Sequence, residues 1–312
     1  MIGSALNDLL DQPEFGHGLA FGIVIGVCGL VVAILWLSVK HRPAPIAGVL
    51  IAAAFVFATT DTTEIPSNVK WGLVLLAAAG VAADYVASYW RPLVVLGVGF
   101  ALPGASLLTT NTELPTPNWV NTLVVVTVTV GGTLVADFDR RHHDRGWAPM
   151  LFAMSALGVY LTVPDTERAM VLLGAILPIA LLGWPVPLAS LGGVGAYPCV
   201  GLLAWVAAID GRGRLAAFIG GVTCLGLLVV EPIARYLRTE SRGFIDALPR
   251  EPLTVIVVGF AQLVLVFGAS RVVGLRPRVS EAALLAIVEL VAAVAVLTML
   301  AAVEREEAPD DG

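Results

Sequence analysis

The feature that most constrains this chain is the succession of long apolar runs from Leu19 to Val303. Hydrophobic residues make up 58% of the sequence and charged residues only 13%, which is far from the usage of soluble globular domains. A run of about 20 apolar residues crosses the hydrocarbon layer as a helix, because a helix satisfies its backbone hydrogen bonds internally. The sequence therefore predicts an all-α fold, a polytopic transmembrane helix bundle.

We expect one transmembrane domain over residues 19–303, with an extracytoplasmic segment, 1–18, before it and an acidic cytoplasmic tail, 304–312, after it. The run 168–209 is ambiguous, because its length fits two spans joined by a tight turn at 184–187 or one longer crossing. The first choice gives eleven spans and the second gives ten. The eleven predicted spans are about 19–39, 44–60, 70–88, 92–109, 119–137, 147–163, 168–184, 188–209, 214–233, 252–270 and 280–303.

A short module recurs along the chain. The stretch Arg42–Pro66 aligns without a gap to Arg91–Pro115, and nine of the 25 positions are identical, where this composition gives about two or three by chance. A looser third copy begins at Trp147-Ala148-Pro149. The pattern predicts tandem two-helix repeats that cross the membrane in the same orientation.

Charge predicts how the chain is oriented. Residues 1–18 contain no Lys or Arg, whereas Lys40-His41-Arg42 directly follows the first apolar run, which we interpret as a signal-anchor. The N-terminus is then outside, the C-terminus is cytoplasmic, and the location is the cell membrane. Under this topology eleven of the 18 basic residues are cytoplasmic, and the ten-span alternative gives the same division. The net charge of −6 argues against nucleic acid as a partner.

Glu289 is the deepest ionisable residue of the predicted spans. Glu289 and Gln262 lie at similar depth below the outer boundary on the last two spans, which predicts a hydrogen bond between them. An ionisable side chain in hydrocarbon is costly, so it has a partner or a purpose. The pair is either a polar clasp between two helices or a carboxylate that couples transport to a proton or cation.

Asp84 and Asp137 occupy matching positions near the cytoplasmic ends of two spans. Either they line a cytoplasmic vestibule as a symmetric pair, or each is an interfacial carboxylate that reaches water or an arginine, as Asp137 would with Arg141 four residues on. We expect residues 137–145 to form a solvated, positively charged loop, and the spacing of their Asp and His residues fits no zinc signature.

Helix breakers interrupt two predicted spans, at Pro103-Gly104 and at Gly195 to Pro198. In transporters, unwound stretches near the midplane expose backbone groups that bind substrate. The two positions are therefore a candidate substrate site, with ordinary proline kinks as the alternative.

Two further segments predict contacts. One face of the first span lacks side chains, because glycines recur every four residues at Gly18, Gly22 and Gly26. Such a face favours close helix packing or self-association. The loop 234–251 carries four arginines among apolar residues and is either a membrane-surface helix with a cytoplasmic contact or a plain connector.

These observations favour a transporter or permease-like protein for a small solute or lipid-like molecule. The alternative is a structural or assembly subunit of a membrane complex, and a membrane-embedded enzyme comes third, because none of the four histidines falls inside a span. We predict no metal and no cofactor, since the three cysteines are isolated in apolar runs.

Overall fold

The computed structural model describes residues 65–87, 94–110, 118–142, 146–163, 190–209, 215–238 and 252–274, together with isolated positions between 168 and 180, at 245, and between 284 and 295. The described residues contain helices and no strand, which confirms the all-α class for this part of the chain. The predictions for Gly18, Gly22, Gly26 and Glu289, for the two terminal segments and for the spans 19–39 and 44–60 concern residues outside this part.

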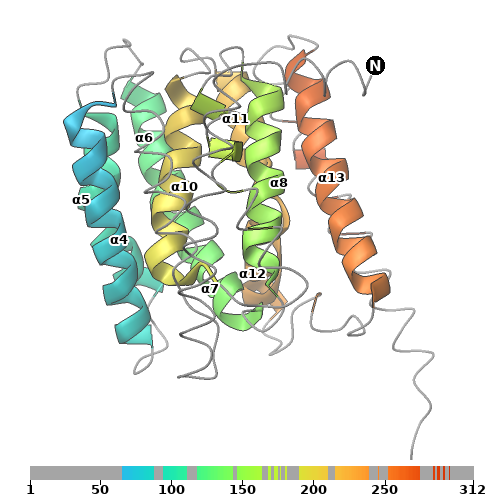
Figure 1. Cartoon of the computed structure of the whole chain (residues 1–312), viewed down its shortest axis with the longest axis horizontal. Coiled ribbons are helices and arrows are strands. Elements are labelled where there is room, and N and C mark those ends of the chain that lie inside the picture. Colours follow the sequence, from blue (N-terminus) through green and yellow to red (C-terminus); the bar gives the residue numbers. More distant parts are fainter. Residues whose placement is uncertain are drawn as a thin grey trace, which may run out of the picture.

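Helices from different parts of the chain lie side by side in Figure 1, where α10 stands between α4 and α8. Their bounds are α4 Ser67–Ala87, α5 Val94–Thr109, α6 Asn118–Val126, the π-helical segment η1 Thr127–Gly131, α7 Gly132–His142, α8 Trp147–Thr162, α10 Gly192–Ile209, α11 Leu215–Thr223, α12 Leu227–Arg238 and α13 Pro252–Gly274.

Helix α10 is the core of the described part. Every residue from Gly195 to Ile209 is buried, and a helix that is apolar on all sides is typical of a protein core or a membrane span. Figure 1 shows α4 and α5 on one flank of α10 and α13 on the other.

The ends of α4 define the direction of its neighbours. At its start, Asn68 Nδ2 donates to Leu107 O near the end of α5 (3.1 Å), so the two helices are antiparallel. At its other end, Asp84 pairs with Arg140, near the end of α7. Helix α8 begins five residues after α7 ends, so α5 and α8 run in the same direction. The predicted repeat requires its second and third copies, which contain α5 and α8, to run in the same direction. The repeat itself stays a prediction.

Glycines allow close approach between helices α4, α5 and α10. A Cβ added to Gly80 would lie 2.0 Å from Gly193 O, and one added to Gly104 would lie 2.9 Å from Gly72 O. Small residues at such crossings bring two backbones together and maximise dispersion contacts where no hydrophobic force acts between helices. Gly104, predicted as part of an unwound stretch, lies inside helix α5 at its contact with α4.

The expected interruptions of the two proline-containing spans are wrong. Pro103 lies inside α5 and Pro198 inside α10, and both helices continue past them. A proline removes one backbone hydrogen bond, and neighbouring turns hold the helix together across it.

The chain breaks where no interruption was predicted. Helices α11 and α12, which the sequence predicts as one span, are separated at Cys224-Leu225-Gly226 and bent by 72°. Gly226 has φ +42°, a left-handed conformation that a side chain rarely adopts. This break lies inside the bundle, because Cys224 and Leu225 are buried.

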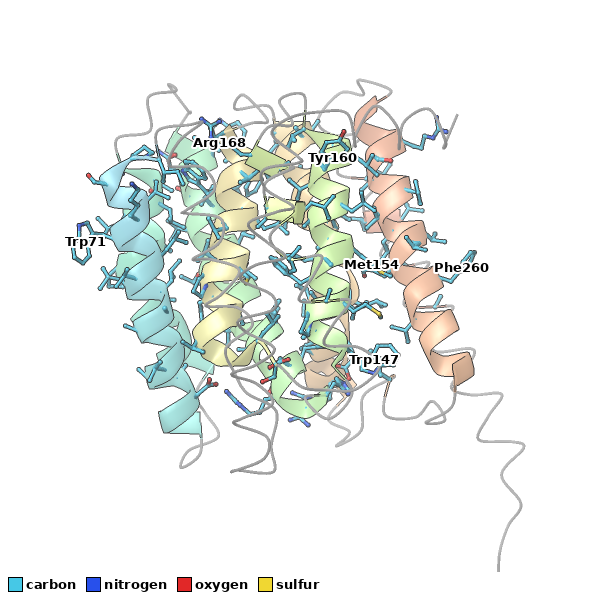
Figure 2. The ribbon with its side chains drawn as sticks, in the orientation of Figure 1. Trp71, Trp147, Met154, Tyr160, Arg168 and Phe260 are labelled. Carbon is cyan, nitrogen blue, oxygen red and sulfur yellow. The ribbon has the colours of Figure 1, made fainter. Side chains whose placement is uncertain are left out.

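Large apolar side chains cover the outside of the bundle. Trp71 on α4 is 65% exposed and Phe260 on α13 is 67% exposed, and they point away from opposite flanks in Figure 2. Among the described helices, 119–142 and 192–209 are each long and apolar enough to cross a membrane, and the bent pair α11–α12 makes a third if it is one span. Length, composition and exposed apolar surface thus agree with a membrane environment.

Candidate functional site at the charged end of the bundle

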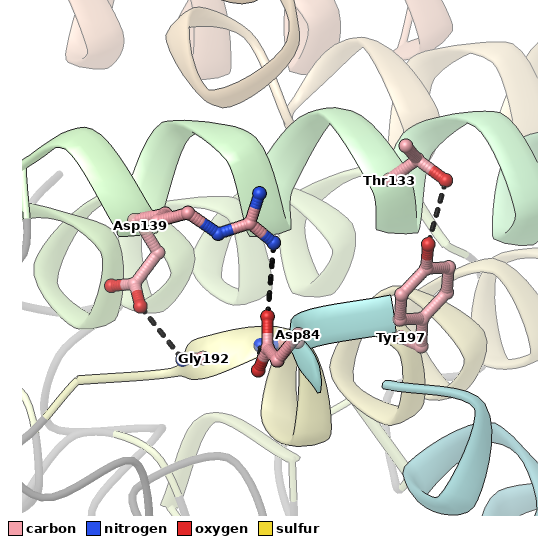
Figure 3. A network of polar contacts seen from close by, with 7 residues as sticks. Asp84, Thr133, Asp139, Gly192 and Tyr197 are labelled. Atoms are coloured by element: carbon pink, nitrogen blue, oxygen red, sulfur yellow. Dashed lines mark hydrogen bonds and ion pairs between the residues drawn. The ribbon is translucent and has the colours of Figure 1, made fainter. Parts of the chain in front are cut away.

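Charged side chains gather where α4, α7 and α12 end and α10 begins; we call this region the charged end. The first two amides of α10 bind two carboxylates there, and Figure 3 shows one of these contacts, between Gly192 and Asp139. Gly192 N–H donates to Asp139 Oδ2 and Gly193 N–H donates to Asp84 Oδ2, both at 2.7 Å. The first amides of a helix have no intrahelical partner and carry a partial positive charge, so carboxylates stabilise them.

Glycine is required at both positions of this cap. Gly192 has φ +57°, and a Cβ on Gly193 would lie 2.8 Å from Asp84 Oδ1. The Gly-Gly start of α10 is therefore what lets two carboxylates from two other helices reach adjacent amides. Deeper in the same interface Thr133 and Tyr197 hydroxyls form a buried hydrogen bond of 2.8 Å, which ties α7 to α10 (Figure 3).

Ion pairs connect the helices of the charged end to one another. Asp84 Oδ1 lies 3.0 Å from Arg140 Nη2, and both side chains are more than a third exposed, so this pair contributes little stability. Asp137 contacts two arginines, Arg141 on its own helix (3.5 Å) and Arg235 on α12, which donates to it. The Asp137–Arg235 pair is mostly buried and links α7 to α12.

Glu231 and His142 form the most deeply buried pair of titratable side chains that the structure describes. Glu231 on α12 is fully buried, His142 at the end of α7 is 1% exposed, and Glu231 Oε1 lies 3.8 Å from His142 Nε2. The Phe138 ring packs against the imidazole, with ring centroids 4.7 Å apart. Within the described residues neither Glu231 oxygen accepts a hydrogen bond. A carboxylate in such surroundings is costly when ionised, which makes it a candidate for proton exchange.

Gln262 on α13 occupies the break between α11 and α12. Its Nε2 donates to Cys224 O (2.7 Å) and its Oε1 accepts from Leu227 N–H (3.1 Å), with Ser155 Oγ 3.5 Å from Nε2. One side chain thereby satisfies a carbonyl and an amide that the break would leave without partners. The predicted bond to Glu289 is untested, because Glu289 lies outside the described residues.

The structure brings some of the predicted residues together and separates others. Asp84 and Asp137 both lie at the charged end, where each pairs with arginine, and the predicted contact of Asp137 with Arg141 is confirmed. Gly195 and Pro198 are buried in the first turns of α10, near that end. Pro103 is on the exposed side of α5, apart from the other candidates.

Two predicted loops begin inside helices. Residues 137–142 belong to α7. Asp139 and His142 are only 2% and 1% exposed, whereas Arg140 and Arg141 are exposed, so this part of the expected loop is helical and only partly solvated. Likewise Arg235 of the predicted loop 234–251 is in α12 and buried. Neighbouring helices supply carboxylates and amide groups as partners, and these contacts extend both helices beyond their apolar runs.

Sequence reasoning passed over Glu231. The signal was present, because Glu231 directly follows the apolar run Leu227–Val230 and therefore falls within a predicted span. Glu231 is followed by a proline and by the arginines of the next predicted loop. Its position therefore resembled the end of a span, where a carboxylate reaches water. Among the described side chains, no three His, Cys, Asp or Glu residues converge as a metal site requires.

Comparison with known proteins gives no relative. No protein-family model matches the chain, and a search of the curated proteins returns no match.

Proposed function

We propose that this chain is a multi-pass transport protein of the cell membrane, permease-like, for a small solute or lipid-like molecule. The observation that carries the proposal is the broken helix α11–α12 beside the buried Glu231–His142 pair. Broken helices and ionisable groups inside a bundle are both typical of transporters, in which they form pathways and moving parts.

The described geometry suggests how such a protein works. Helix α12 carries Glu231 and Arg235, and it joins α11 through a bend of 72° at Gly226. Rotation of α12 about this bend separates Arg235 from Asp137 on α7 and opens the charged end. The charged end is cytoplasmic in the proposed topology of eleven spans, with the N-terminus outside, because it contains arginines of two predicted inner segments.

The topology has its own test. A reporter fused after Asp210 is outside in the eleven-span topology. A cytoplasmic reporter at that position would refute it and favour ten spans. The same set of fusions, placed after residues 42, 145 and 250, should report the cytoplasm in the proposed arrangement.

Transport is tested by solid-supported-membrane electrophysiology on proteoliposomes of the full chain, exposed in turn to amino acids, sugars, nucleosides, organic acids and organic cations. We expect a charge displacement with at least one class. The hinge is tested with Gly226→Ala, because the new Cβ would lie 2.5 Å from Gln262 Oε1 at a left-handed residue.

Gly99→Ala is the matched control for that variant. Nothing lies within 4 Å of a Cβ at Gly99, so this substitution should leave the currents at wild-type size. Gly226→Ala should reduce them at least about tenfold, a loss equivalent to about 1.4 kcal/mol. Equal currents in the two variants would refute the hinge, and no response to any solute class would count against transport.

An assembly subunit remains the second candidate, and one observation favours it. The outer face of α13 forms an apolar groove of about 430 Å³. Its lining residues are Phe260, Leu263, Val264, Phe267, Gly268 and Arg271.

Exposed apolar surface of this kind packs against lipid or against another membrane helix. Co-purification of a stoichiometric membrane protein, lost in Val264→Arg, would favour this role over transport. The predicted contacts through Gly18, Gly22, Gly26 and the loop 234–251 would then serve the same assembly.

A further inference from the structure

Glu231 lies where a change of its charge affects the ion pairs of the charged end. It is fully buried, and among the described residues the titratable or charged groups near it are His142 and Asp137 on α7 and Arg235 on its own helix. Helix α8, which also packs against α12, begins there with the buried apolar residue Trp147. His142 is the titratable group whose contact with the carboxylate is described, at 3.8 Å.

We propose that Glu231 is the proton-binding site of this transporter and that His142 delivers the proton; the inference rests on the transport function proposed above. The coupling ion is then H⁺. The two atoms concerned, Glu231 Oε1 and His142 Nε2, are 3.8 Å apart, and closing that gap by about 1 Å brings them within hydrogen-bond reach.

The transfer is a simple exchange of one proton. The N–H bond at Nε2 of the imidazolium breaks, and an O–H bond forms at Oε1 of Glu231. This step converts an imidazolium and a carboxylate into a neutral imidazole and a carboxylic acid. His142 is 1% exposed, so its imidazole takes the next proton from water only after α12 rotates and opens the charged end.

Protonation of Glu231 acts on the ion pair that closes this end. Glu231 and Arg235 are four residues apart on α12, so they share one helix face. An ionised Glu231 competes with Asp137 for the Arg235 guanidinium, whereas a neutral Glu231 leaves that guanidinium to Asp137. Proton uptake therefore strengthens the α7–α12 ion pair, and proton release weakens it.

The direct test is infrared difference spectroscopy of the reconstituted full-length protein as a function of pH, with no solute present. We expect a carbonyl band of a protonated carboxylic acid that titrates in the wild type. This band should be lost in Glu231→Gln and kept in Asp139→Asn, the matched variant of another buried carboxylate. A band unchanged in Glu231→Gln would overturn the proposal.

A second variant covers the case in which Glu231→Gln does not fold. In His142→Gln the side chain cannot deliver a proton to Glu231, so the shift of the carboxylic acid band on transfer to deuterated water should be at least about tenfold slower than in the wild type. An unchanged rate would overturn His142 as the proton donor to Glu231.

Transport assays separate this inference from the function on which it rests. With a solute found by electrophysiology, the wild type should accumulate it on a pH gradient and also exchange labelled for unlabelled solute. Glu231→Gln should lose at least about 90% of the gradient-driven accumulation while exchange persists. Accumulation that survives in Glu231→Gln refutes the coupling site alone, whereas a wild type that shows neither activity refutes transport.

Discussion

Replacing Gln262 with leucine tests whether a single side chain holds the broken helix together. In the folded protein Gln262 satisfies Cys224 O at 2.7 Å and Leu227 N–H at 3.1 Å, and its own side chain is fully buried. Leucine is similar in size but bonds to neither group. The substitution therefore leaves one buried carbonyl and one buried amide at the bend without partners.

The magnitude follows from these two groups. A buried polar group left unsatisfied costs about 1–3 kcal/mol, whereas side-chain hydrogen bonds between membrane helices average only about 0.6 kcal/mol. Two groups thus give a range of about 1–6 kcal/mol. We expect a loss of about 2–3 kcal/mol, because both bonds are made to backbone atoms whose positions the bend fixes.

Unfolding in mixed detergent micelles, followed by tryptophan fluorescence, measures this loss. Asn68→Leu is the matched control, because it removes the amide's hydrogen bonds to Leu107 O and Thr110 O at a partly exposed position, where water replaces them, and should cost under about 1 kcal/mol. Hydrogen exchange supplies a local readout, since Leu227 N–H should lose protection in Gln262→Leu. A free energy of unfolding within about 0.5 kcal/mol of wild type, with protection unchanged, would refute the reasoning.

Two further substitutions test the packing and the charge pairs by the same unfolding measurement. Gly80→Ala should destabilise the protein by about 1–3 kcal/mol, because its Cβ would lie 2.0 Å from Gly193 O. Gly99→Ala is the control, since its Cβ meets open space and the substitution should be neutral or slightly stabilising. Equal effects of the two substitutions on the free energy of unfolding would contradict the close α4–α10 crossing. Arg235→Gln should cost about 3 kcal/mol, because it removes the closer and more buried of the two arginines that pair with Asp137. Arg140→Gln, at an exposed pair, should cost under about 1 kcal/mol, and the reverse order would show that burial does not decide the energy of these pairs.

The amino-acid sequence by itself determined the all-α class and the places where most described helices lie. An apolar run of about 20 residues has one low-energy conformation in lipid, the helix. A helix makes its backbone hydrogen bonds within the same segment, so this conformation can be predicted from the segment alone. Helices α8 and α10 thus fall where the runs at 147–163 and 188–209 predict helix. The Asp137–Arg141 contact was likewise readable, since it depends only on four-residue spacing along a helix.

Only the tertiary structure decided which polar residues meet. Gln262 finds Cys224 and Leu227 because α13 packs across a break between α11 and α12 that no proline marks. Glu231 faces His142 because α12 packs against the end of α7. Pro103 and Pro198 remain helical because helices around them hold the turns in place. In a bundle the energy of a buried polar group depends on the partner that another helix brings. The spacing of residues along one segment does not predict that partner.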